Sequence, residues 1–284
     1  MDLSRSTAEI FVPDGVTIAD ALARTTHLGI GAHQDDLEIM AMEGILAGFG
    51  RDDQWFTGVI VTDGAGSSRD SLYAGYTDDE MRKVRRREQK KAAYVGEFGA
   101  VVFLDHPSAG VKDPADPTPG ADLDALLAAM RPGCVYTHNL ADKHPTHVSV
   151  GLRALEALRR AAPRSAPDRV LGCEVWRDLD WMLDRDKVVM ALDEHENISH
   201  ALVAIFDSQI VGGKRYDLAT MGRRRAHATY SESHATDTAQ MVNFAMDLTP
   251  LVLDPSADIV AHVDSHLARF ANSVRDAITQ YAAP

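Results

Sequence analysis

Two short segments of the sequence hold histidines and aspartates at spacings that suit a metal site. In GAHQDD, His33 precedes Asp36 by three residues, so a turn at a helix start could point both side chains at one ion. In KHPTHV, Pro145 suits the first residue of a helix, with His144 before it and His147 in the first turn. Imidazole and carboxylate both bind zinc, at about 2.0–2.2 Å. Together the segments predict a site of two histidines and one carboxylate that leaves a position for water.

Asp35 lies directly beside Asp36, where two like charges would repel each other. A divalent cation would favour the ionised form of both carboxylates. Asp36 could then bind the metal, while Asp35 points to the open coordination position and takes a proton from water. Histidines and aspartates at strand ends also serve as hydrogen-bonded caps, and this alternative stays open on spacing alone.

The elements that must bring these segments together are indicated by apolar runs. Five short runs, at residues 27–33, 55–64, 100–106, 134–139 and 170–176, alternate with longer segments of helical periodicity. This alternation predicts an α/β fold with a mainly parallel sheet. Ligands of such sheets bind outside the carboxyl ends of the strands, and both histidine-containing segments follow an expected strand. In the helix after Pro145, Val148 and Leu152 mark the expected apolar face, which excludes both histidines.

The rest of the chain is expected to complete one domain over residues 1–284, with a core over about 25–210 and a C-terminal extension over about 211–284. Residues 106–122 contain four prolines and predict a polar surface loop. A further strand is expected within residues 186–193 and a helix over 196–210. Residues 223–237 are interpreted as a solvated loop, although their histidines could reach a substrate. Trp176 and Trp181 are either a wall for a sugar ring or core residues.

The composition restricts the partners. Asp and Glu number 42 against 29 Lys and Arg, for a net charge of -13, which disfavours nucleic acid and anionic membrane surfaces. No window resembles a membrane span or a signal peptide. The two cysteines lie in apolar runs and favour a reducing compartment over a disulfide framework. We therefore expect a cytoplasmic protein with a small-molecule ligand, and a homo-oligomer is compatible with the sequence.

Several motifs together resemble those of the PIG-L/LmbE-like deacetylases. AHQDDLE is similar to the family's AHPDDE motif and HPTHV to its HPDHV motif, in the same order. VRRREQKKAA resembles the family's R-x-x-E helix, with Arg85 and Glu88, and IFDSQI resembles a recurrent Ser-Gln segment. The resemblance covers most of residues 27–210. It implies a Rossmann-like, three-layer, usually zinc-dependent amidohydrolase that removes acetyl groups from N-acetylglucosamine derivatives or cleaves related amides.

The resemblance also implies roles for individual residues. His33, Asp36 and His147 would be the ligands of Zn2+, although Fe2+ or another divalent ion would also suit this set. Asp35 would be the general base. His144 would stabilise the oxyanion of the reacting carbonyl.

Substrate contacts are implied more loosely. Arg85 would reach substrate hydroxyls or a phosphate. Gln34 replaces the family's proline, Thr146 replaces the aspartate between the two histidines, and Ser108 stands near an expected loop aspartate. These departures concern substrate contact and the support of the ligands. Asp142 could substitute for a missing aspartate or cap its own loop.

Two other classes of function remain compatible with the sequence. A metal-dependent phosphoesterase would also use adjacent aspartates and histidines, but it would generally need carboxylates for a second ion. A non-catalytic sugar-binding protein on the same fold would be consistent with Thr146 and Ser108. The family resemblance favours the deacetylase over both.

Overall fold

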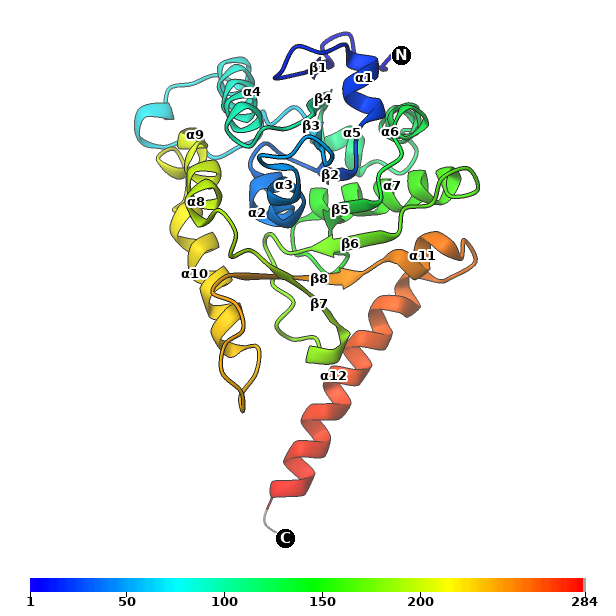
Figure 1. The fold of residues 1–284 in the computed structure, drawn as a ribbon, viewed down its shortest axis with the longest axis vertical. Helices are drawn as coiled ribbons and strands as arrows, with labels where there is room; N and C mark the ends of the chain where they lie inside the picture. The colour runs from blue at the N-terminus through cyan, green and yellow to red at the C-terminus, as the bar shows by residue number, and fades with distance from the viewer. Residues whose placement is uncertain (283–284) are drawn as a thin grey trace.

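An eight-stranded β-sheet forms the middle layer of the protein, whose computed structural model describes residues 1–282 (Figure 1). The strands lie in the order β1-β4-β3-β2-β5-β6-β8-β7, and the five from β4 to β6 run parallel. Their bounds are β1 Glu9–Phe11, β2 His27–Gly31, β3 Phe56–Thr62, β4 Ala100–His106, β5 Cys134–His138, β6 Arg169–Cys173, β7 Lys187–Ala191 and β8 Val242–Asp247. The expected α/β fold with a mainly parallel sheet is confirmed.

The parallel strands coincide with the five apolar runs to within a few residues. Strands β3, β4 and β5 are buried along their whole length. A strand covered on both faces carries a nearly continuous apolar sequence rather than an alternating one, as in FTGVIVT and AVVFLDH. This is why the runs could be recognised without a period of two.

Helices cover both faces of the sheet and complete three layers (Figure 1). One face buries Ile30 and Val102 among α1, α6, α7 and α11, and the other buries Ile60 and Phe103 among α2, α3, α4 and α8. The α-helices are α1 Ile18–Ala23, α2 Asp36–Met40, α3 Met42–Gly48, α4 Asp78–Val95, α5 Ser108–Lys112, α6 Thr118–Ala129, α7 Pro145–Ala161, α8 Glu196–Ala204, α9 Asp207–Ile210, α10 Tyr216–Tyr230, α11 Thr249–Leu253 and α12 Ile259–Tyr281.

The C-terminal part of the chain contributes to the sheet. Strand β8 pairs antiparallel with β6 on one side and with β7 on the other. Strand β1 adds a third antiparallel pairing, at the opposite edge. The C-terminal extension therefore supplies a strand that separates β6 from the edge. None of the described helices combines the length and apolar composition that a membrane span requires.

Two segments expected to be loops are partly helical. Residues 106–122 contain α5 and the start of α6, because proline is compatible with the first turn of a helix: Pro119 lies in the first turn of α6. Residues 223–230 belong to α10, whose buried side is formed by Thr220, Arg224, His227 and Ala228. Three of those four residues are polar, so the side did not stand out as an apolar face.

The apolar face expected for α7 was also wrong by part of a turn. Val148 and Leu152 are only half-buried, whereas His147, Val150 and Ala154 are buried. The actual buried face therefore includes His147. The histidine lies on the core side of the helix because its ring is held by other polar groups at the sheet edge, which are described below.

Substitutions at two glycines, one in α3 and one in α10, test how the helices pack. Gly44 lies inside α3, and a Cβ there would meet Cε2 of the buried Tyr136 ring at 2.5 Å. Gly222 lies inside α10 with open space around it. We expect Gly44→Ala to lower the free energy of unfolding by about 1–3 kcal/mol through overpacking. Gly222→Ala should raise it by about 0.5–1 kcal/mol through helix propensity. Urea unfolding of both variants measures the contrast, and equal effects would contradict this packing.

Candidate active site

The polar residues of both motifs converge where the order of the parallel strands reverses. Strands β3 and β4 continue from β2 in one direction, and β6 continues from β5 in the other. The carboxyl ends of β2 and β5 therefore border the crevice in which open α/β sheets bind ligands. The GAHQDD segment leaves β2 at this edge, and the KHPTHV segment follows β5.

The turn after β2 is strained and points both aspartates inward. Asp35 has a φ of 106°, which is rare for a residue with a side chain. Asp36 begins α2, and its Oδ2 accepts the backbone N–H of His33 at 2.7 Å. This hydrogen bond closes the turn and fixes the Asp36 carboxylate beside the His33 ring.

The start of α7 follows the expected pattern. His144 is the N-cap residue, and Pro145 is the first residue of the helix. The His144 side chain makes no capping hydrogen bond, so its ring is free to face the crevice. The backbone N–H of His144 donates instead to Asp142 at 2.9 Å. The Asp142 carboxylate thus holds the backbone just before the start of α7.

His33, Asp36 and His147 form a compact donor set. His33 Nδ1 lies 3.2 Å from His147 Nε2 and 3.4 Å from Asp36 Oδ2, and His147 Nε2 lies 3.5 Å from Asp36 Oδ1. Ligands held at about 2.0–2.1 Å by a tetrahedral zinc ion are separated by roughly 3.3–3.5 Å. All three donor atoms lie within 4.8 Å of one another. The nitrogen and oxygen donors thus fit zinc or a similar divalent ion in chemistry and spacing.

A second set of groups supports this cluster from inside the protein. Asp142 Oδ2 lies 3.4 Å from His147 Nδ1 and also accepts the backbone N–H of Trp176 at 3.1 Å. A carboxylate behind a ligand histidine fixes its tautomer and the direction of its other nitrogen. His138, on β5, stacks on His147 with ring centroids 3.9 Å apart. His138 Nε2 accepts the backbone N–H of Ala32 at 2.9 Å, so this ring is neutral.

Burial and charge shift the pKa values of these groups in opposite directions. Burial alone would raise the pKa of Asp36, but the His147 and His138 imidazoles hold it well below its usual value. Burial alone would lower the pKa of His147, but the Asp36 and Asp142 carboxylates raise it. Burial raises the pKa of Asp35 to about 7, although Arg85 opposes this shift. The two adjacent aspartates therefore differ strongly in proton affinity.

Helix α4 holds the strained turn in place. Arg85 donates to the carbonyl of Gln34 at 2.6 Å and lies 3.5 Å from Asp35 Oδ1. Gln89 accepts the backbone N–H of Asp35 at 3.4 Å. Glu88 accepts both the N–H and the hydroxyl of Ser208, at 2.8 and 2.6 Å. The R-x-x-E helix and the Ser-Gln segment, far apart in sequence, are thus joined directly.

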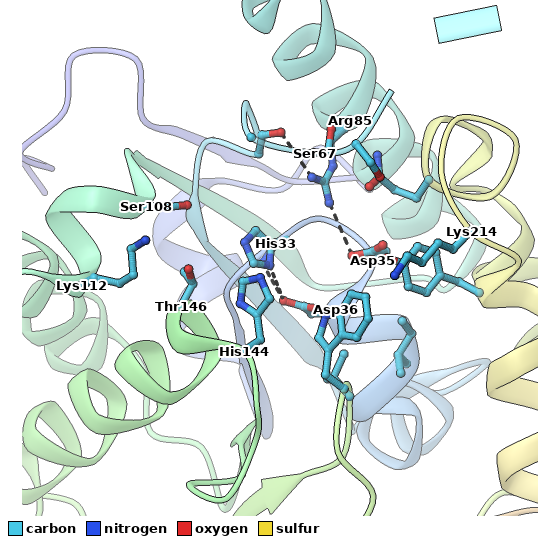
Figure 2. A pocket seen from close by; sticks show the side chains of 18 residues that line it. His33, Asp35, Asp36, Ser67, Arg85, Ser108, Lys112, His144, Thr146 and Lys214 are labelled. Atoms are coloured by element: carbon cyan, nitrogen blue, oxygen red, sulfur yellow. Dashed lines mark hydrogen bonds and ion pairs between the residues drawn. The ribbon is translucent and has the colours of Figure 1, made fainter. Parts of the chain in front are cut away.

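A cavity of about 540 Å³ opens above the donor set (Figure 2). Its lining includes two carboxylates, three cationic side chains, several hydroxyl groups and two aromatic rings. The lining residues are His33, Asp35, Asp36, Ile39, Gly64, Gly66, Ser67, Ser68, Arg85, Ser108, Lys112, His144, Thr146, Val175, Trp176, Gln209, Lys214 and Tyr216.

Most residues singled out in the sequence lie at this cavity, but their contacts differ. Ser108 lines it, and so does Arg85, whose guanidinium binds backbone carbonyls beside Asp35. Asp142 does not line it, because its carboxylate points at His147. Gln34 does not line it either, and its buried side chain packs against Gly64.

Some contributors were missed or left undecided in the sequence. His138 and Gln89 support the site from a strand end and from the basic helix, and only the position of His138 after an apolar run could have indicated it. Trp176 lines the cavity, whereas Trp181 packs near Phe270. His227 is buried against Glu174, and His234 is exposed. Neither of these two histidines lines the cavity.

The fold and the donor set define an α/β protein with a two-histidine, one-carboxylate site at the switch point of its sheet. The model of the PIG-L family, described as GlcNAc-PI de-N-acetylase, matches residues 28–158. This segment runs from β2 into α7 and includes all three donor residues, Asp35 and His144. This segment of the chain matches the PIG-L family. A search of curated protein sequences finds no match.

Solved structures share the fold at low sequence identity. N,N'-diacetylchitobiose deacetylase from Pyrococcus horikoshii is 14% identical with a TM-score of 0.62, over 84% of this chain and 88% of that one. A conserved protein of Thermus thermophilus is 17% identical with a TM-score of 0.61, over 82% and 99%. The 4-carboxy-2-hydroxymuconate hydratase of Pseudomonas putida is 15% identical with a TM-score of 0.59, over 79% and 96%. The fold is therefore shared by proteins with different reactions.

The buried histidine behind the donor set predicts how stability depends on pH once metal is removed with a chelator. Burial, with help from His147, lowers the pKa of His138 to about 4, against about 6.5 in an unfolded chain. Between these values the unfolded chain binds more protons, so the free energy of unfolding falls as the pH falls below about 6.5. For His138 the slope approaches about 1.4 kcal/mol per pH unit.

Urea unfolding at pH 7, 6 and 5 measures this slope for the wild type and for His138→Asn. The variant should be less stable at pH 7 but should show a shallower dependence on pH. His234→Asn, at an exposed loop position, is the matched control and should keep the wild-type slope. A His138→Asn protein with an unchanged slope would show that His138 is not the titrating group.

Proposed function

We propose that the protein is a metal-dependent amide hydrolase that removes the acetyl group from an N-acetylated amino sugar or a related N-acyl compound. The observation that carries this proposal is the donor set of His33, Asp36 and His147. His33 and Asp36 line one cavity together with Asp35, and His147 is buried behind them. The match of residues 28–158 to the PIG-L family model supports the same reaction. The similarity to N,N'-diacetylchitobiose deacetylase is consistent with an acetylated sugar as substrate.

His33, Asp36 and His147 would hold the metal, for which Zn2+ fits best and Fe2+ is the alternative. When bound, a divalent ion at this position supplies Lewis-acid activation of a water molecule and of the amide carbonyl. Asp142 keeps the Nε2 of His147 directed at the donor set. The buried Asp36 carboxylate supplies the one anionic ligand.

Asp35 is the proton carrier in this proposal. It is buried beside the donor set, where a bound divalent ion would favour its ionised form, the form that can accept a proton. Asp35 takes a proton from the attacking water as the water oxygen bonds to the carbonyl carbon. It then gives that proton to the amide nitrogen as the C–N bond breaks. The products are acetate and a free amine, so the atoms balance without a further reactant.

His144 stabilises the oxyanion as a neutral hydrogen-bond donor. Burial, together with the neighbouring His147 and His33, lowers the pKa of His144 to about 4. The ring is therefore uncharged near pH 7 and can donate one N–H. An N–H held beside the carbonyl favours the tetrahedral state over the planar amide.

The remainder of the cavity accepts the amine part of the substrate. Trp176 and Tyr216 form one wall, with ring centroids 6.0 Å apart and perpendicular planes. The volume lies within the range of small-molecule sites. Tyr216 comes from the C-terminal extension, which we infer to be part of the same domain because β8 pairs within the sheet. A cytoplasmic location and a homo-oligomer remain predictions.

A phosphoesterase with two ions receives less support from the described residues. The second possible metal group, His138, Asp142 and His147, shares His147 with the first and is wholly buried. His138 Nε2 already accepts the N–H of Ala32. We therefore expect one metal ion per chain rather than two.

The assignment of Asp35 is tested with Asp35→Asn, because asparagine keeps the shape and tolerates the left-handed backbone region. The variant should retain about one zinc ion per chain but release acetate about 10²–10⁴-fold more slowly from an N-acetylated amino sugar. His147→Ala should lose both zinc and activity. Elemental analysis and an acetate-release assay over a panel of N-acetylated amino sugars measure these outcomes.

Asp105→Asn is the matched control, since Asp105 is also buried at a strand end with a positive φ but does not line the cavity. It should keep both zinc and activity. Acetate release by Asp35→Asn at the rate of the wild type would exclude Asp35 as the base. A zinc-loaded wild type that releases acetate from no compound in the panel would count against the hydrolase.

A further inference from the structure

One end of the cavity is lined by hydrogen-bond donors and no carboxylate. Ser108 and Lys112 come from α5, and Thr146 comes from the first turn of α7. Figure 2 shows these three side chains on one side of His33, and Asp35 with Lys214 on the other. Helices α5 and α7 are held together, since Arg153 on α7 donates to the carbonyl of Asp113 just after α5. The three donors therefore have a common, braced support.

The charges around this end differ from those of the protein as a whole. The chain carries a net charge of -13, yet the carboxylates that line the cavity are only Asp35 and Asp36. Lys112 takes part in none of the ion pairs or side-chain hydrogen bonds among residues 1–282. Its ammonium group is thus available to a ligand. The amino end of α7 adds a partial positive charge next to Thr146.

The other lysine of the cavity is differently placed. The Lys214 ammonium group lies 4.6 Å from the centre of the Trp176 ring, in a cation–π contact. Figure 2 draws it on the Asp35 side of the donor set. An anion at Lys214 would lie on the side of a carboxylate, whereas an anion at Lys112 would not. The Lys112 end is therefore the better place for a negative group.

We propose that the substrate carries an acidic group, a carboxylate or a phosphate, which binds to the Lys112 ammonium and the Ser108 and Thr146 hydroxyls. This inference rests on the proposed function for the nature of the N-acyl group, whereas recognition of the acid can be measured separately. An anion that moves from water into a protein site loses its hydrogen bonds to water, so cationic or hydroxyl donors of the protein must replace them. In an acidic protein, a local cation also offsets the repulsion that an anionic substrate meets on approach. The substrate class is thus an acidic N-acyl amino compound.

The test compares matched neutral and acidic compounds. N-acetylglucosamine is the neutral probe, N-acetylglucosamine 6-phosphate carries a phosphate, and N-acetylmuramic acid carries a carboxylate. The zinc-loaded wild type should release acetate from at least one acidic probe with a kcat/KM at least about tenfold above that of the neutral probe. The acidic probe that shows the preference identifies which acid is recognised.

Lys112→Ala should reduce this preference about tenfold, mainly through KM, and added salt should weaken it in the wild type. Lys91→Ala is the matched control, because Lys91 is an exposed lysine of α4 that does not line the cavity. It should keep the wild-type preference. Equal kcat/KM for all three probes, or equal preference in Lys112→Ala and Lys91→Ala, would overturn the inference.

Calorimetric binding to zinc-loaded Asp35→Asn separates this inference from the proposed reaction. The Kd for the acidic probe should be about tenfold lower than for the neutral one, and the added Lys112→Ala change should remove the difference. If this preference is found while the wild type releases no acetate, the acid site stands and the hydrolase is rejected. If acetate is released but no binding preference exists, the hydrolase stands and the acid site is rejected.

Discussion

The structure of the site depends on burying one carboxylate, that of Asp36, at the end of a central strand. A buried anion is tolerated only when donors or positive charges replace the water it loses. The His33 backbone N–H supplies one hydrogen bond, and the rings of His33 and His147 lie 3.4 and 3.5 Å from the carboxylate oxygens. Each ring must in turn be held, which Asp142 does for His147. The cluster therefore requires β2, β5 and α7 to meet at one edge of the sheet.

The same requirement explains the strain at Asp35. To bring Asp36 beside the rings of α7, the chain must turn sharply as it leaves β2, and this places Asp35 at a φ of 106°. Such a conformation persists only where neighbours over-determine it. Gln89 and Arg85 provide this constraint from α4. Gly64 leaves room for the turn, since a Cβ at this position would clash with Gln34 Oε1. Helix α4 thus fixes the conformation of the turn at Asp35.

Sequence patterns predict the structural features that depend on residues close together in the chain. The parallel strands were found because burial on both faces makes their sequences apolar. The spacing of His33 and Asp36 around a turn indicated two donors, whereas the choice of His147 as the third was implied by the family resemblance. The start of α6 was missed because prolines at a helix start resemble those of a loop. Helix α10 was missed because its buried face holds Arg224 and His227. These side chains hydrogen-bond to tertiary partners that the local sequence does not reveal, the carbonyl of Glu38 and the carboxylate of Glu174.

The wall of the cavity could not be predicted for a related reason. Trp176, Lys214 and Tyr216 come from segments that have no spacing rule in common, and they meet only because β8 returns the C-terminal part of the chain to the sheet. The segment that matches the family ends at residue 158. It contains the donor set, Asp35 and the end of the cavity lined by Ser108, Lys112 and Thr146. Under our two proposals, one continuous segment supplies both the residues of the reaction and the residues that bind the acid group. The fit of the rest of the substrate depends on how the C-terminal part of the chain packs against this segment.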